Sequence, residues 1–121
     1  MKVPLLDLKA QYKTIKKEID EALIGVAESQ NCILGAEVEK LEKSLNEYLD
    51  CKYSIGVSSG TDALLVALMA IDLKPGDEVI IPTYSFFATA GVVSRLNAVP
   101  VFIDCDPVTF NLDPAKLKSL I

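Results

Sequence analysis

The short polar run Ser58 to Asp62 contains the residue types of this chain best suited to bind an anion. It lies between a β-favouring run and an apolar run with the composition of a helix. Ser59 is a good N-cap, and Gly60 allows a ligand to approach the backbone closely. Thr61 and Asp62 then fall in the first helical turn, whose amide hydrogens have no acceptor within the helix. Those amides and the helix dipole predict a phosphate site, the alternative being a capped helix in which these residues serve the turn alone.

A second candidate for ligand binding is the aromatic stretch Pro82 to Phe87, which follows another predicted strand. The chain alternates strands with helices, in the order Tyr53 to Val57, Gly60 to Ile71, Glu78 to Ile81, Phe86 to Leu96 and Val101 to Ile103. Short loops between such elements favour a parallel α/β sheet covered on both faces, because the crossovers are right-handed. Ligands lie beyond the carboxyl ends of the strands in sheets of this kind. The phosphate turn and the aromatic rings both occupy that edge, which suits a phosphorylated aromatic cofactor.

Two amphipathic helices are predicted before the sheet. In the first, apolar residues from Tyr12 to Val26 recur at spacings of three and four. In the second, residues with the same spacing form a stripe that is expected to be buried: Val38, Leu41, Leu45, Tyr48 and Leu49. Further along, Lys74 to Asp77 is a turn signal, and Asp113 followed by Pro114 marks another helix start.

The length and composition fit one globular domain. Half of the 121 residues are hydrophobic, which is ample for a core. The formal net charge is −5 and the 12 basic residues are scattered, so a nucleic-acid partner is not expected. No apolar run approaches the roughly 18 residues that cross a bilayer, and Pro4 and Asp7 interrupt the start of the chain before a signal-type region develops. These features predict a cytoplasmic protein with no membrane partner.

Cysteine and histidine usage restricts the chemistry. Cys32, Cys51 and Cys105 are odd in number and far apart, so neither a disulfide framework nor a metal site is expected. The chain contains no histidine, which excludes Ser-His-Asp and Cys-His catalysis and imidazole ligands within these residues. A cofactor is therefore expected to carry any chemistry.

Six motifs follow one another along the chain. They are Pro4-Leu-Leu-Asp-Leu8, Ile33-Leu-Gly-Ala-Glu-Val38, Ser59-Gly-Thr-Asp-Ala-Leu64, Pro75-Gly-Asp-Glu-Val79, Pro82-Thr-Tyr-Ser-Phe-Phe-Ala-Thr89, and Val101-Phe-Ile-Asp104 with Asn111-Leu-Asp-Pro114. In this order and spacing they resemble the amino-terminal part of the DegT/DnrJ/EryC1/StrS family, the pyridoxal-phosphate-dependent nucleotide-sugar aminotransferases. The resemblance covers nearly the whole chain, with Ala36 standing where the family usually has proline.

The resemblance implies an α/β fold, namely an incomplete fold-type I large domain of three α/β/α layers with a mainly parallel sheet. Within residues 1–121, residues 1–50 would be a helical lead-in and residues 51–121 the start of the sheet. The same fold places the Tyr53 to Val57 strand at one end of the sheet. It pairs the two later strands with each other.

The resemblance also implies roles for individual residues. Gly60 and Thr61, together with Asp62 and the capping Ser59, would hold the cofactor phosphate, and Phe86 would lie against the pyridine face. Stacking of this kind on a flat π system is worth about 0.5 to 1.5 kcal/mol beyond burial.

Neighbouring aromatic and acidic residues are expected to have structural roles. Tyr84 and Phe87 are expected to pack, because adjacent side chains on a helix diverge. Asp104 and Asp106 are expected to serve turns. The resemblance puts the Schiff-base lysine, and the aspartate that pairs with the pyridinium nitrogen, beyond Ile121, so no catalytic residue is expected in this chain.

The activity implied by the resemblance is amino transfer from glutamate to a nucleotide-linked keto sugar, with pyridoxal phosphate as the cofactor. A 3-keto sugar is favoured over a 4-keto sugar, and family members are homodimers. One alternative is a sugar dehydratase of the same family, which uses the same cofactor and has histidine in place of the lysine. Another is a non-catalytic truncated fragment whose helices only mediate association.

Overall fold

The computed structural model describes residues 3–118 and residue 120. The chain divides into two compact units, Met1–Gly56 and Val57–Ile121. Within the described residues, no helix combines the length and the apolar character needed to span a membrane.

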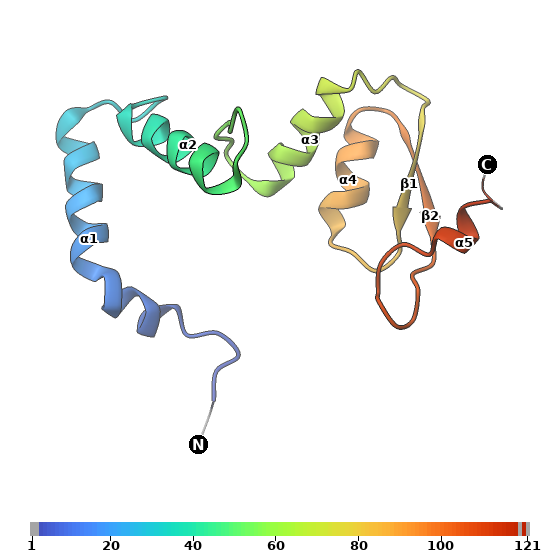
Figure 1. Ribbon diagram of the computed structural model, residues 1–121, viewed down its shortest axis with the longest axis horizontal. Coiled ribbons are helices and arrows are strands. Elements are labelled where there is room, and N and C mark those ends of the chain that lie inside the picture. Colours follow the sequence, from blue (N-terminus) through green and yellow to red (C-terminus); the bar gives the residue numbers. More distant parts are fainter. Residues whose placement is uncertain (1–2, 119, 121) are drawn as a thin grey trace. The chain divides into compact units, whose positions relative to one another are not determined.

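The first unit consists of two helices, α1 (Leu8–Ser29) and α2 (Ala36–Leu49), which confirms both predicted helices (Figure 1). Asp7 caps α1, because its Oδ1 accepts a hydrogen bond from the backbone N–H of Ala10 at 3.0 Å. Gly35 precedes α2 at a position with no room for a side chain, since a Cβ there would lie 2.4 Å from the carbonyl oxygen of Asn31.

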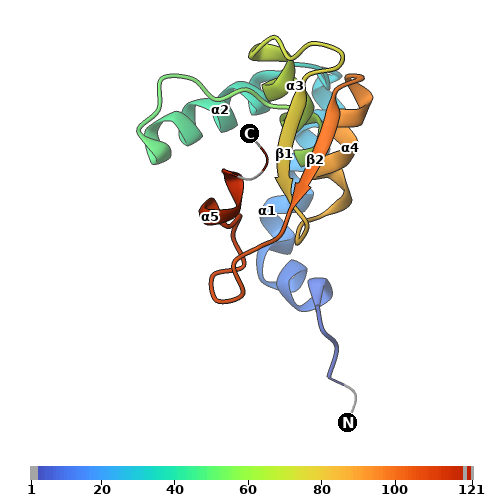
Figure 2. The ribbon, with the colours of Figure 1, turned by 90° about the vertical axis from the view of Figure 1, so that its right-hand side faces the viewer.

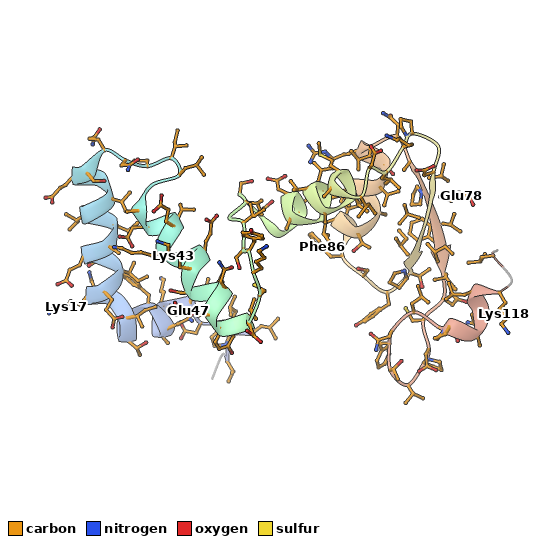
Figure 3. All side chains as sticks on the ribbon, turned by 45° about the horizontal axis from the view of Figure 1, so that its top comes forward. Lys17, Lys43, Glu47, Glu78, Phe86 and Lys118 are labelled. Atoms are coloured by element: carbon orange, nitrogen blue, oxygen red, sulfur yellow. The ribbon has the colours of Figure 1, made fainter. Side chains whose placement is uncertain are left out.

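The predicted burial of the apolar stripe on α2 is wrong. Leu41 is 56% exposed, Tyr48 is 85% exposed and Leu49 is 60% exposed, while only Val38 is partly buried. Amphipathic spacing identifies a face suited to burial, but it does not supply the surface that covers it. Within the described residues of this unit, no element covers that face. Figure 3 labels three charged residues of the same unit, Lys17 on α1 and Lys43 and Glu47 on α2.

The second unit is an α/β structure, which confirms the predicted class. Its elements are α3 (Gly60–Ala70), β1 (Glu78–Pro82), α4 (Phe87–Arg95), β2 (Val99–Ile103) and the short α5 (Pro114–Leu117). The two strands pair in parallel, from Glu78 opposite Val99 to Pro82 opposite Ile103, and α4 connects them and packs against them (Figure 2). Helix α3 packs on α4. The buried hydrophobic residues are Ile81, Ala88, Val92, Val93, Ala98 and Ile103.

The pairing of β1 with β2 was predicted correctly, but the strand expected at Tyr53 to Val57 is absent. That segment has no regular secondary structure, and Tyr53 and Ile55 are 73% and 76% exposed. A β-strand needs a hydrogen-bonded neighbour, and the described residues provide none beside this segment. The expected burial of both faces of β1 is also incomplete: Ile81 is buried, whereas Val79 and Ile80 are only partly buried.

The turn signals are confirmed. Asp77 closes the turn before β1, because its Oδ2 accepts the backbone N–H of Lys74 at 2.7 Å. Gly76 has a φ of 88°, a left-handed conformation that favours glycine. Asp113 caps α5 by accepting the backbone N–H of Ala115 at 2.9 Å, and Pro114 occupies the first helical position.

The isolated 121-residue chain is expected to self-associate as its concentration rises. Both strands of a two-stranded sheet are edges, and their unpaired backbone groups can pair with another copy. Phe102 on β2 is also 56% exposed. Light scattering across a concentration series measures the effect, and Phe102→Lys should reduce it because an edge lysine opposes strand pairing. A chain that stays monodisperse throughout would contradict this prediction.

Candidate functional site

The N-terminus of α3 has the predicted cap. The Ser59 hydroxyl oxygen accepts the backbone N–H of Asp62 at 3.1 Å, and the Ser59 carbonyl oxygen accepts the N–H of Ala63 at 3.0 Å. In the described chain, the backbone N–H groups of Gly60 and Thr61 have no hydrogen-bond acceptor. A Cβ built on Gly60 meets no atom within 4 Å, so the space beside the Gly60 backbone is open. The turn therefore offers two free amides at a helix N-terminus, the donor set that suits a phosphate group.

The side chain of Asp62 is part of the same turn. Its Oδ2 is hydrogen-bonded to the hydroxyl of Ser58, and its backbone N–H donates a hydrogen bond to the Ser59 hydroxyl oxygen. The carboxylate stabilises the positive end of the helix dipole. Asp62 thus fixes the shape of the turn, and the free donors belong to Gly60 and Thr61.

Phe86 lies where the sequence predicted, beside Thr61. It precedes α4, and its ring is 78% exposed. Phe86 and Thr61 line one pocket of about 370 Å³, and residues along the length of α4, from Phe87 to Arg95, form its other sides. Figure 3 labels Phe86 at the start of α4. The structure thus brings Thr61 and Phe86 together in one pocket, and their cofactor-binding roles stay a prediction.

Hydrogen bonds on both sides of Phe86 fix its backbone. The N–H of Thr83 donates to the carbonyl oxygen of Ile103 at 2.9 Å, which continues the sheet by one bond past β1. The hydroxyls of Ser85 and Thr89 are 2.6 Å apart, and the carbonyl oxygen of Phe86 accepts the N–H of Thr89 at 3.1 Å. These bonds define where α4 begins.

The expected packing role of Phe87 is wrong, because its side chain is 82% exposed. Its ring lies over Gly91, where an added Cβ would come within 3.2 Å of the ring. Tyr84 is 73% exposed, and its ring contacts that of Phe110 with 5.6 Å between the centroids. Tyr84 and Phe110 are distant in sequence, and no periodic pattern connects them. The sequence therefore offered no signal for the contact between their rings.

Asp104 and Asp106 serve the loop after β2, as predicted. Asp104 pairs with Lys116 at 3.4 Å. Asp106 Oδ1 accepts the N–H of Thr109 at 2.7 Å, the hydroxyl of Thr109 at 3.0 Å and the N–H of Val108 at 3.0 Å. The Thr109 amide, followed by its hydroxyl and the Val108 amide, lowers the pKa of Asp106 below its ordinary value of 3.8.

The loop after β2 is expected to loosen only in acid. Because the pKa of Asp106 is lowered in the folded chain, its contribution to stability is present above pH 3.8 and is lost as the pH falls below that value. An acid titration followed by the amide chemical shifts of Val108 and Thr109 should therefore have its midpoint below 3.8. Asp106→Asn should abolish this titration. A midpoint above 3.8 would show that the three hydrogen bonds do not hold the carboxylate.

The described residues contain no group of three acidic, cysteine or histidine side chains arranged to hold a metal ion. Cys32, Cys51 and Cys105 are free thiols.

Comparison with known proteins identifies the family. The sequence model of the DegT/DnrJ/EryC1/StrS aminotransferase family matches residues 13–121 of this chain. The chain belongs to this family. The match includes the starts of α3 and α4, and with them the turn of Ser59 to Asp62 and the segment around Phe86.

Individual DegT-family relatives are similar over almost the whole chain. A pleiotropic regulatory protein of Geobacillus stearothermophilus is 48% identical over 121 residues, which are 100% of this chain and 32% of the relative. A UDP-2-acetamido-2-deoxy-3-oxo-D-glucuronate aminotransferase of Pseudomonas aeruginosa is 44% identical over 98% of this chain and 33% of the relative. The chain thus spans about a third of the length of these curated relatives.

The crystal structure of ntda from Bacillus subtilis, with the bound cofactor PMP, has the same fold in this region. Its TM-score is 0.92 with 39% sequence identity, over 99% of this chain and 28% of that chain. At this level of identity and overlap, the parallel α/β arrangement of the second unit is that of the DegT family.

Proposed function

We propose that residues 1–121 are the cofactor-binding, amino-terminal part of a pyridoxal-phosphate-dependent sugar aminotransferase. One observation carries the proposal: Thr61, which follows the open backbone of Gly60, and the exposed ring of Phe86 line the same pocket. Hydrogen-bond donors suited to a phosphate, next to a flat apolar ring, fit a cofactor that has a phosphate and an aromatic ring.

Each candidate residue then has a physical task. The N–H groups of Gly60 and Thr61 bind the phosphate, and Ser59 can donate its hydroxyl hydrogen while its oxygen accepts from Asp62. Asp62 keeps the turn in shape through its bond to Ser58. Phe86 contacts one face of the pyridine ring and excludes water from that face. When bound, pyridoxal phosphate supplies the electron sink for amino-group transfer.

The proposed reaction moves an amino group from glutamate to a nucleotide-linked keto sugar, with a 3-keto sugar preferred over a 4-keto sugar. Family membership supports the reaction class, and the 3-oxo substrate in the name of the Pseudomonas aeruginosa relative supports the preference. The proposal includes a cytoplasmic homodimer, with residues 1–50 as a helical lead-in and residues 51–121 as the start of the large domain. The catalytic lysine is placed outside these residues.

Cofactor binding by Phe86 variants tests the proposal. In the complete protein, Phe86→Ala should weaken pyridoxal phosphate binding by about two- to tenfold, the equivalent of losing a ring contact of about 0.5 to 1.5 kcal/mol. Phe86→Tyr and Phe86→Trp should retain binding, because each keeps a flat ring. Equilibrium dialysis with detection of pyridoxal absorbance gives the dissociation constants.

Two controls make the result specific. Tyr48→Ala removes another exposed aromatic side chain, on α2, and should leave the affinity unchanged. Assays of the loaded protein with glutamate and keto nucleotide sugars distinguish amino transfer from the loss of water that a dehydratase would catalyse. A protein that binds no pyridoxal phosphate, or whose Phe86→Ala variant binds it normally, would refute the proposed site.

A further inference from the structure

A pair of aromatic rings joins two loops that follow the carboxyl ends of β1 and β2. Tyr84 lies in the loop after β1 and Phe110 in the loop after β2, with ring centroids 5.6 Å apart and ring planes at 43°. We call this pair the ring clamp. Its rings are 73% and 60% exposed, so the contact lies outside the buried core.

The loop that presents Phe110 is held in a strained conformation. Phe110 has a φ of 59°, a left-handed value that is unfavourable for a residue with an aromatic side chain. The N–H of Phe110 donates to the carbonyl oxygen of Asp106 at 2.9 Å, and the N–H of Asp106 donates to that of Asn111 at 2.9 Å. An isolated antiparallel β-bridge, which is a backbone pairing of Cys105 with Leu112, closes the base of the loop. The strain persists because these bonds and the Asp106 carboxylate over-determine the loop.

The other half of the ring clamp lies two residues before Phe86. Backbone and hydroxyl bonds fix Thr83 and Ser85 on either side of Tyr84. The ring of Tyr84 is therefore the side chain through which the loop after β2 contacts the segment that leads into Phe86. Without that contact, the hydrogen bond from Thr83 to Ile103 still ties this segment to β2, but the loop after β2 loses its ring contact with it.

We propose that the ring clamp positions Phe86, so that Tyr84 and Phe110 set the orientation of the ring that faces the cofactor. Both are positioning residues, because they act through the backbone and do not line the pocket of Thr61 and Phe86. This inference rests on the proposed pyridoxal phosphate site. An aromatic pair is worth about 0.5 to 1.5 kcal/mol, so breaking the ring clamp can weaken cofactor binding by no more than about tenfold.

The first test measures cofactor affinity in the complete protein. Phe110→Leu should raise the dissociation constant of pyridoxal phosphate by about two- to tenfold, and Tyr84→Leu should do the same from the other loop. Phe110→Tyr keeps a ring and should restore the affinity. Val108→Ala alters an exposed residue of the same loop outside the ring pair and should change nothing.

The second test needs no cofactor. The 121 residues contain no tryptophan, so Phe86→Trp introduces a single tryptophan into this chain, which is measured at a concentration where the chain is monodisperse. Adding Phe110→Leu to this variant should lower the fluorescence anisotropy of the indole, whereas adding Phe110→Tyr or Val108→Ala should not. Circular dichroism confirms that each variant is folded.

The outcomes separate the two hypotheses. If the unaltered protein binds no pyridoxal phosphate, the proposed function fails, and with it the functional role of the ring clamp. If the unaltered protein binds the cofactor but Phe110→Leu changes neither the affinity nor the anisotropy, the ring clamp is refuted and the proposed function stands. A loss of affinity that Phe110→Tyr does not restore also refutes the ring clamp, because the ring contact is then irrelevant.

Discussion

Borohydride reduction of the 121-residue chain, after incubation with pyridoxal phosphate, is expected to leave no single lysine stoichiometrically labelled. The same chain is expected to convert no glutamate to 2-oxoglutarate. Amino transfer needs a lysine amine held at the cofactor aldehyde, from where it can also move protons at the substrate carbon. None of the described lysines lines the pocket of Thr61 and Phe86. In the unit that contains this pocket, Lys74 pairs with Asp72 and Lys116 pairs with Asp104.

Peptide mapping by mass spectrometry measures the labelling, at a concentration where the chain is monodisperse. Pyridoxal without its phosphate is the control, and it should label the exposed lysines in a similar diffuse pattern. A single dominant lysine that is modified only by the phosphorylated cofactor, together with turnover of glutamate, would show that the catalytic amine lies within these residues.

Gly60→Val should weaken pyridoxal phosphate binding in the complete protein by about ten- to a hundredfold. A valine side chain would occupy the open space beside the Gly60 backbone and hinder a phosphate that approaches the free amides of Gly60 and Thr61. A hydrogen bond to a charged group contributes about 1.5 to 3 kcal/mol, which sets this range. The fold should tolerate the change, because a Cβ on Gly60 meets no atom within 4 Å.

Gly25→Val is the matched control for this experiment. A Cβ on Gly25 also meets no atom within 4 Å, but this residue lies within α1. Equilibrium dialysis should show normal cofactor affinity for Gly25→Val. Binding of pyridoxal without its phosphate should be equally weak with and without Gly60→Val. If Gly60→Val binds pyridoxal phosphate as tightly as the unaltered protein, the phosphate does not contact these amides.

Elements with strong local signals could be predicted from the sequence. Ser59 and Asp113 mark helix starts because a side-chain oxygen satisfies an amide that the helix leaves free. The parallel pairing of β1 with β2 follows from a strand, a helix and a strand joined by short turns. Thr61 and Phe86 share a pocket although the strand predicted before Thr61 is absent, because α3 packs on α4.

Features that depend on a partner surface could not be predicted. The apolar residues of α2 have the spacing of a buried face, but spacing does not determine what covers them. The segment Tyr53 to Val57 favours β-structure by composition, yet it forms no strand without a neighbour. The contact between Tyr84 and Phe110 depends on two loop conformations, one of them with a left-handed aromatic residue, and neither leaves a periodic signal.

The hydrophobic residues that are buried in the described chain all lie between Ile81 and Ile103. They belong to one continuous segment, so their contacts span short distances in sequence and close at a small cost in loop entropy. During synthesis, α3 leaves the ribosome before the segment from Ile81 to Ile103 does. Because α3 packs on α4, it has no packing surface from this unit until α4 has been made. We therefore expect the core of β1, α4 and β2 to form first, and α3, with the turn of Ser59 to Asp62, to dock on α4 afterwards.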